Sequence, residues 1–211
     1  AMKAVILAAG RGERLRPLTD NRPKPLLPVC NRALIDYQLL MLKRYGIDEI
    51  AVVVGYHEKL MRDHLEGYAC LRDAGTGTAS ALYAARDFLD EDFVVLYGDV
   101  FYDGSLEKLV ATRDSMAVCE VKDVSAFGAV RIEQGRLVDI VEKGGSGSGL
   151  VNAGMYHLTP DILDIIEHTP QSERGEYELT DSLVEYGRER GVRVVPLSGY
   201  WRDIGHPWDY L

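Results

Sequence analysis

The sequence has few cysteines and no long apolar segment. Its 211 residues include three cysteines that are scattered and lack CxxC spacing: Cys30, Cys70 and Cys119. This pattern argues against both a disulfide framework and a zinc site. No apolar run approaches the ~20 residues of a membrane-spanning helix, and the run from Ala4 to Ala9 is too short for a signal peptide. We therefore expect a soluble, cytoplasmic protein without a membrane partner.

Positive charge is also in short supply. Lys and Arg total 24 against 33 Asp and Glu, which gives a formal net charge of −9. Such a chain has no general electrostatic attraction to nucleic acid, so we do not expect a nucleic acid partner. Any phosphate ligand must be bound by a local site. The hydrophobic share of 46% suits a chain that buries a sizeable core, and we expect a single domain over 1–211.

Short apolar strands alternate with helical patterns in the first half of the chain. Strands are predicted at 3–7, 49–54 and 93–96, and helices at 33–45, 58–65 and 78–89. This alternation implies a largely parallel sheet covered by helices on both faces.

After Asp99 the pattern becomes richer in strands. They are predicted at 116–120, 128–132, 137–141, 151–158 and 192–196, with helices at 106–112, 162–167 and 179–190. The residues therefore predict a three-layer α/β/α architecture with a mixed sheet. The segment from Gly144 to Gly149, GGSGSG, is of low complexity and is predicted to be a flexible loop.

A glycine-rich segment follows the first predicted strand. It reads LAAGRGERL from Leu7 to Leu15, so small residues at a strand end are followed by Arg14. Small residues let backbone N–H groups approach a polyphosphate closely. Leu15 stands where a dinucleotide fingerprint has its third glycine, and no GK[ST] ending of a P-loop is present, which disfavours both of those sites. Taken alone, the segment is equally compatible with a plain turn.

Lys24 lies between two prolines, Pro23 and Pro25. They restrict the backbone on both sides, so the ammonium would be aimed at phosphate oxygens with a small ordering cost. An isolated lysine is usually a solvated surface charge, so this interpretation depends on the surrounding pattern.

The segment LAAGRGERLRPLT, followed by RPKPLLPV, resembles the N-terminal signature of sugar-1-phosphate nucleotidylyltransferases. The resemblance continues in the family's order through GTA at 77–79, YGD at 97–99, FG at 127–128, EK at 142–143, NAG at 152–154, RGE at 174–176 and WRDIG at 201–205. It is greatest for the pyrophosphorylase domain of archaeal bifunctional enzymes. It implies a Rossmann-like nucleotidyltransferase fold with a mixed, mostly parallel central sheet. A nucleotide-binding half of about 2–115 and a sugar-phosphate-binding half of about 116–211 are implied as well.

The resemblance also implies roles for individual residues. Nucleotide contacts are implied for Leu7, Ala8, Ala9, Gly10, Gly12, Lys24, Gly77, Thr78 and Gly98. Sugar-phosphate contacts are implied for Gly128, Glu142, Lys143, Asn152 and Arg174. Arg14, Lys24 and Asp99 are the implied catalytic residues, and Asp99 with Asp203 would hold Mg²⁺, a hard ion that takes oxygen ligands.

Each of these residues also has an ordinary structural interpretation. An aspartate after a strand is as often a cap or turn residue, and Asn152 would serve equally in a turn. Glu142 and Lys143 would suit an exposed ion pair, and Arg174 a surface charge beside a helix.

The reaction implied by the resemblance transfers a nucleotidyl group from a nucleoside triphosphate, UTP or dTTP favoured, to a sugar 1-phosphate. Glucose-1-phosphate or N-acetylglucosamine-1-phosphate is the favoured acceptor. The alternatives are a mannose-1-phosphate guanylyltransferase, another sugar- or alcohol-phosphate nucleotidylyltransferase, and a non-catalytic subunit that senses nucleotide sugars. Arg72 stands where many relatives have a base-reading glutamine, so the base stays open. The oligomeric state also stays open, a homo-oligomer included.

Overall fold

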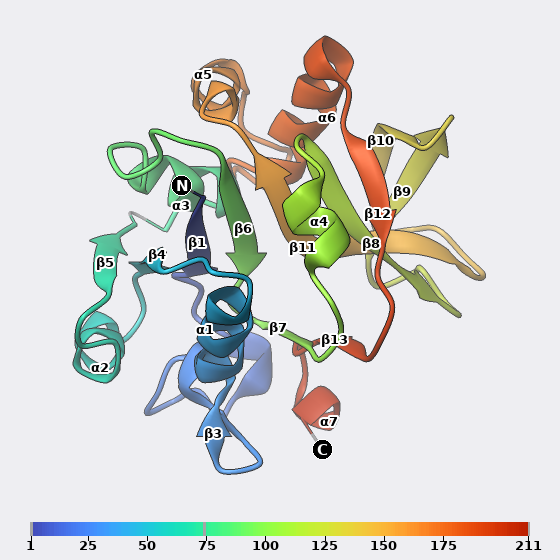
Figure 1. The fold of residues 1–211 in the computed structure, drawn as a ribbon. Helices are drawn as coiled ribbons and strands as arrows, with labels where there is room; N and C mark the ends of the chain where they lie inside the picture. Colours follow the sequence, from blue (N-terminus) through green and yellow to red (C-terminus); the bar gives the residue numbers. More distant parts are fainter. Residues whose placement is uncertain (1, 74, 211) are drawn as a thin grey trace.

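The computed structural model describes residues 2–73 and 75–210 (Figure 1). Its main sheet is built from β1 (Lys3–Ala8), β4 (Glu49–Val54), β5 (Ala69–Arg72), β6 (Phe93–Tyr97), β8 (Ser115–Val121), β9 (Gly128–Glu133), β10 (Arg136–Glu142), β11 (Gly149–Leu158) and β12 (Arg193–Pro196). Two small pairs are β2 (Pro28–Val29) with β3 (Arg32–Ala33), and β7 (Val100–Tyr102) with β13 (Trp201–Asp203). The helices are α1 (Leu34–Arg44), α2 (Glu58–His64), α3 (Thr78–Ala84), α4 (Glu107–Ala111), α5 (Asp161–His168), α6 (Leu179–Arg190) and α7 (Pro207–Tyr210).

Over the described residues the main sheet has nine strands in the order β5-β4-β1-β6-β11-β8-β12-β10-β9. Strands β5, β4, β1 and β6 are parallel, as are β8 and β12. Strand β11 is antiparallel to β6 and β8, and β10 is antiparallel to β12 and β9. Only β10 and β11 therefore run against the common direction within this described sheet, and the predicted mixed, mostly parallel sheet is confirmed.

The alternation of side chains along β1 places one apolar layer on each face of the sheet. Val5 and Leu7 belong to a core that includes residues of α3, α5 and α6. Ala4 and Ile6 belong to a second core that includes residues of α1, α2 and α4. The structure thus has the predicted three layers, with the sheet between two sets of helices.

Most predicted elements lie within a few residues of the observed ones, and the predicted helix 78–89 is the main difference. Helix α3 ends at Ala84, and three-residue turns such as Phe88 N–H to Ala85 O (2.9 Å) continue the chain. The prediction missed α7 and the strands β2, β3, β5, β7 and β13. The last two have three residues each and pair with each other from distant parts of the chain, so no local pattern indicates them.

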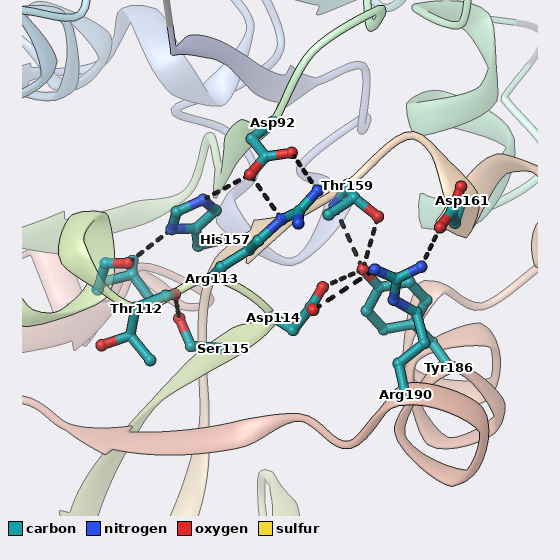
Figure 2. A network of polar contacts seen from close by, with 11 residues as sticks. Asp92, Thr112, Arg113, Asp114, Ser115, His157, Thr159, Asp161, Tyr186 and Arg190 are labelled. Atoms are coloured by element: carbon teal, nitrogen blue, oxygen red, sulfur yellow. Dashed lines mark hydrogen bonds and ion pairs between the residues drawn. The ribbon is translucent and has the colours of Figure 1, made fainter.

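A polar network joins the amino ends of β6 and β8 to helix α6 (Figure 2). Asp92 accepts a hydrogen bond from Arg113 (Nη2–Oδ1 3.1 Å), and the Tyr186 hydroxyl donates to Asp114. Arg190 forms a further ion pair with Asp114 (3.7 Å). These contacts lie at the end of the sheet opposite to the carboxyl ends of β1 and β6. Among the described residues, no helix has the length and apolarity that crossing a membrane requires.

Candidate active site

The carboxyl ends of β1 and β6 lie side by side because these parallel strands are paired, with Leu7 opposite Tyr97. The next residue, Gly98, donates its N–H to Leu7 O at 2.8 Å. A Cβ at Gly98 would lie 2.8 Å from that same oxygen, so a larger residue would push the two segments apart. The glycine therefore lets the segment that carries Asp99 approach the glycine-rich loop.

A cavity of about 160 Å³ lies over this junction. Its lining includes seven of the predicted nucleotide-side residues: Leu7, Ala8, Gly10, Gly12, Lys24, Thr78 and Gly98. Gly12 has a left-handed backbone (φ 62°), and its carbonyl accepts a hydrogen bond from the Thr19 hydroxyl at 2.7 Å. This hydrogen bond ties the glycine-rich loop to Thr19 beside the cavity.

Two predicted nucleotide-side residues are not among those that line this cavity, Ala9 and Gly77. A Cβ at Gly77 would lie 2.4 Å from Tyr177 O, so this glycine permits close packing of the segment before α3. Its neighbour Thr78 lines the cavity and accepts a hydrogen bond from Leu179 N–H through its hydroxyl oxygen (2.9 Å).

Lys24 does not extend into solvent. It begins a short 3₁₀ turn after Pro23, and its side chain is only 12% exposed. Its Nζ lies 3.4 Å from Asp99 Oδ2, beside the carboxylate predicted to hold a metal. The structure thus favours the site interpretation of Lys24 over a solvated surface charge.

The pair β7–β13 brings the two predicted metal ligands together. In this pair Asp203 is opposite Val100, and Ile204 N–H donates to Asp99 O at 2.9 Å. Burial raises the pKa of Asp203 to about 7, with the nearby Asp99 charge as the second cause, while Lys24 and Arg14 oppose the rise. Arg14 is itself exposed and lines the same cavity as Asp99 and Asp203.

The two carboxylates fit a magnesium ion. No group of three or more His, Cys, Asp or Glu side chains in residues 2–73 and 75–210 is arranged to hold a metal. Magnesium does not require one, because it keeps several waters and is usually bound by one or two carboxylates together with substrate phosphates. Asp99 and Asp203 supply such oxygens on adjacent backbone segments, and burial together with the neighbouring Asp99 charge raises the pKa of Asp203.

A second cavity, of about 280 Å³, adjoins the first and shares Thr78, Tyr97 and Asp99 with it. All five predicted sugar-phosphate residues line it: Gly128, Glu142, Lys143, Asn152 and Arg174. Glu142 is opposite Gly128 in the β9–β10 pair, and a Cβ at Gly128 would lie 3.3 Å from Glu142 Oε1. Glycine at 128 leaves room for the carboxylate.

The two polar atoms of the Asn152 side chain have different surroundings. Its Oδ1 accepts hydrogen bonds from Gly154 N–H (3.0 Å) and from the Tyr156 hydroxyl (2.8 Å), which holds the irregular part of β11. Within the described part of the chain its amide nitrogen has no protein partner. Asn152 therefore lies within a strand and not in a turn: its oxygen holds the irregular part of β11, while the nitrogen is available to a ligand in the cavity.

Arg174 is already paired. Its Nη2 lies 2.6 Å from Glu178 Oε1, and the Arg174 side chain is 59% exposed. A phosphate in the cavity would share this arginine with Glu178, a lining residue that the motif-based prediction missed. No local helical pattern indicated this pair, because both residues precede α6, which begins at Leu179.

Other lining residues were quoted in motifs but given no role. Trp201 donates its ring N–H to Ala153 O (3.0 Å), and its ring lies against Phe127. This contact ties β13, which carries Asp203, to the irregular part of β11. Trp201 precedes Asp203 by two residues in the WRDIG motif, so its place in the site could have been predicted from the sequence.

A larger cavity, of about 530 Å³, lies over α5 and α6. Asp164, Asp181, Glu185 and Glu189 are among its lining residues, and none of the predicted site residues lines it. Volume alone would select this cavity. The chemistry selects the cleft at the carboxyl ends of the strands, where open α/β sheets bind their ligands.

Comparison with known proteins identifies the family. The family model described as nucleotidyl transferase matches residues 3–211. The chain belongs to the nucleotidyl transferase family. The curated relatives confirm the resemblance to the sugar-1-phosphate nucleotidylyltransferases of archaea.

Two curated relatives match along the whole chain. The bifunctional protein GlmU of Methanocaldococcus jannaschii is 37% identical over 216 residues, which cover 100% of this chain and 53% of that protein. The low-salt glycan biosynthesis nucleotidyltransferase Agl11 of Haloferax volcanii is 35% identical over 231 residues, covering 100% and 64%. The chain thus spans about half the length of the first of these relatives.

Two solved structures have the same fold. A putative glucose-1-phosphate thymidylyltransferase from Bacillus anthracis superposes with a TM-score of 0.87 at 28% identity, covering 99% of this chain and 92% of that one. An apo UDP-glucose pyrophosphorylase also gives 0.87, at 23% identity, covering 100% and 96%. The predicted Rossmann-like nucleotidyltransferase fold is confirmed.

Proposed function

We propose that this protein transfers a nucleotidyl group from a nucleoside triphosphate to a sugar 1-phosphate and releases pyrophosphate. One observation carries the proposal. A glycine-lined cavity joins a cavity lined by Glu142, Asn152 and Arg174, and Lys24 with Asp99 stands at their junction. Two anionic substrates in these cavities would meet beside these two charged groups.

The cavity beside β1 suits the triphosphate. Small residues line it, so backbone groups approach a polyphosphate without obstruction from side chains. Lys24 supplies a positive charge that is already held in place by the 3₁₀ turn and by Asp99. Arg14 supplies a second, more exposed charge from the lining of the adjoining cavity.

The cavity beside β9, β10 and β11 suits the sugar phosphate. Glu142 accepts hydrogen bonds, as sugar hydroxyls require, and the Asn152 amide nitrogen donates one. Lys143 and Arg174 supply positive charge for the phosphate of the sugar. Each end of a sugar 1-phosphate thus has a chemical match in the lining.

The proposed reaction depends on the positioning of the substrates and not on a protein nucleophile. An anionic oxygen of the sugar phosphate attacks the α-phosphorus in line, the new phosphorus–oxygen bond forms, and the bond to the β-phosphate oxygen breaks. Because the attacking group is already an anion, no protein base is required. Lys24 and Arg14 would stabilise the charge on the transferring phosphorus and on the leaving pyrophosphate. Magnesium, held by Asp99 and Asp203, would supply further charge neutralisation when bound.

Names of relatives support the substrate preference within this proposal. The Bacillus anthracis structure is titled as a putative glucose-1-phosphate thymidylyltransferase, and the Methanocaldococcus jannaschii relative is named GlmU. We propose UTP or dTTP as the nucleotide, and glucose-1-phosphate or N-acetylglucosamine-1-phosphate as the acceptor. The four charged residues Arg14, Lys24, Asp99 and Asp203 gather at one cleft, which favours an enzyme over a sensing subunit.

A substrate panel tests the proposal. Five nucleoside triphosphates would each be assayed with glucose-1-phosphate, N-acetylglucosamine-1-phosphate and mannose-1-phosphate, with pyrophosphate release as the readout. The highest kcat/KM is expected for UTP or dTTP with one of the first two acceptors. A preference for GTP with mannose-1-phosphate, or for CTP, would contradict the substrate assignment. Nucleotide binding without pyrophosphate release from any pair would contradict the proposed reaction.

A further inference from the structure

Helix α1 buries one polar side chain within an apolar face. The buried residues of this helix are Leu34, Ile35, Gln38, Leu39, Met41 and Leu42. Gln38 is only 3% exposed and is one turn of helix from both Leu34 and Leu42. Burial of an amide is unfavourable unless its polar atoms are hydrogen-bonded, so the contacts of Gln38 require an explanation.

The nitrogen of this amide has two partners. Gln38 Nε2 donates to Tyr97 O at 2.7 Å and to Val100 O at 2.9 Å. The orientation of the amide is determined by these contacts, because only its NH₂ group can donate to two carbonyl oxygens. The two carbonyls lie on either side of Gly98 and Asp99, so one side chain closes the turn that carries the predicted metal ligand.

The oxygen of the same amide lacks a hydrogen-bond partner among the described residues. This atom, Gln38 Oε1, is buried. A methionine or leucine would fill this space without an unsatisfied oxygen, and would lose only the two bonds to the turn. We therefore attribute the role of the Gln38 amide to its hydrogen bonds with the turn and not to its packing in the core.

Two backbone hydrogen bonds also hold this turn, from β1 and from the residue after β13. Gly98 N–H donates to Leu7 O in β1 (2.8 Å), and Asp99 O accepts from Ile204 N–H just after β13 (2.9 Å). Gln38 adds a third attachment, from the helix layer beneath the sheet. Without it, the carbonyls of Tyr97 and Val100 lose their shared donor, and the direction of the Asp99 side chain is less restricted.

We propose that Gln38 is a positioning residue that sets the direction of the Asp99 carboxylate relative to Asp203 and Lys24. This inference rests on the proposed function, in which the two carboxylates hold Mg²⁺. Gln38 is absent from the residues that line either cavity, so it acts through the turn and touches neither substrate.

The test compares Gln38→Met with Leu42→Met in the full chain. Both variants place methionine on the buried face of the same helix, but only the first removes the bonds to the turn. The readouts are Mn²⁺ binding, measured from the electron paramagnetic resonance signal of the free ion, and the Mg²⁺ concentration for half-maximal turnover. Circular dichroism and urea unfolding establish that each variant is folded.

For Gln38→Met we expect the Kd for Mn²⁺ and the Mg²⁺ concentration for half-maximal turnover to rise by about 10-fold or more, as after the loss of other groups that orient metal ligands. Turnover should recover in part at high Mg²⁺, and the KM for the sugar phosphate at saturating Mg²⁺ should stay unchanged. For Leu42→Met, a nearly volume-conserving change, we expect both constants to stay within about 2-fold of wild type.

Three results would overturn the assignment. The first is a folded Gln38→Met variant with wild-type Mn²⁺ binding, and the second is an equal weakening in Leu42→Met. The third is failure of both Gln38→Met and Gln38→Leu to fold, since the amide would then be a requirement of the fold. If the wild-type protein itself bound no Mn²⁺ and released no pyrophosphate, the proposed function would fail along with this inference. Wild-type activity with an unaffected Gln38→Met variant would overturn this inference alone.

Discussion

Replacement of Lys24 by methionine is the sharpest single perturbation of the cleft. Methionine keeps most of the aliphatic stem, which packs beside Gly12, and removes the ammonium that lies 3.4 Å from Asp99 Oδ2. The side chain is only 12% exposed, so solvent screens its charge weakly. We expect Lys24 to act on the triphosphate, because the cavity that it lines contains the glycine-rich loop and none of the predicted sugar-phosphate residues.

The size of the effect follows from the loss of one charge-assisted contact in the transition state. Removal of a single oxyanion donor costs on the order of 2–4 kcal/mol, and we expect a similar loss here. At about 1.4 kcal/mol per factor of ten, kcat/KM should fall by roughly 30- to 1000-fold. The methionine also leaves Asp99 and Asp203 less compensated, so a small loss of stability should accompany the kinetic effect.

Steady-state kinetics with each substrate varied in turn would measure this effect. Lys143→Met is the matched control, because Lys143 carries the same charge and lines only the second of the two cavities. The control should raise the KM for the sugar phosphate, whereas Lys24→Met should leave that KM nearly unchanged. If Lys24→Met raised only the KM for the sugar phosphate and left kcat intact, the division of the cleft into two sides would be wrong.

Three further predictions follow from individual contacts. Glu142→Gln should raise the KM for the sugar phosphate by about 10-fold through weaker hydrogen bonds to sugar hydroxyls, with an unchanged nucleotide KM in the same assay. Asp203→Asn should stabilise the metal-free protein at pH 8, because it removes a buried charge near Asp99. The free energy of unfolding should rise by about 1–2 kcal/mol, seen as a higher melting temperature. The exposed control Asp87→Asn should leave the melting temperature unchanged. Tyr186→Phe should lower the free energy of unfolding in urea by about 1–3 kcal/mol, since its partner Asp114 is left without this donor. The KM values for both substrates should stay constant, because this network lies at the end of the sheet opposite to the cleft. A changed KM there would show coupling that the structure does not indicate.

The elements that the sequence predicted well are those with a strong local pattern. Strand β4 and helix α6 were predicted with their observed limits, because each has an apolar pattern bounded by clear breaks. Strands β7 and β13 have three residues each and exist through their mutual pairing, which no short window of sequence contains. The proximity of Asp99 and Asp203 therefore came from the family resemblance and not from periodicity.

The predicted site residues largely line two adjoining cavities, and what the prediction omitted has physical causes. Gly77 packs against the backbone of Tyr177, a contact between segments far apart in the chain, and its contact with the base stays a prediction. Glu178 was overlooked because its ion pair with Arg174 forms in irregular backbone before α6, where no local pattern indicates it. Gln38 lies within the predicted helix 33–45 and was given no role, because its bonds to Tyr97 and Val100 form only once the layers are assembled.

The most direct test of the proposed function is the Mg²⁺ dependence of pyrophosphate release in the wild type, Asp99→Ala and Asp203→Ala. Both side chains line the 280 Å³ cavity and not the apolar core, so both variants should fold. The proposal predicts that wild-type activity disappears with EDTA and returns with Mg²⁺, and that neither variant recovers turnover at saturating Mg²⁺. Near wild-type activity in either variant at saturating Mg²⁺ would contradict the two-carboxylate site, and wild-type activity unaffected by EDTA would contradict the metal dependence.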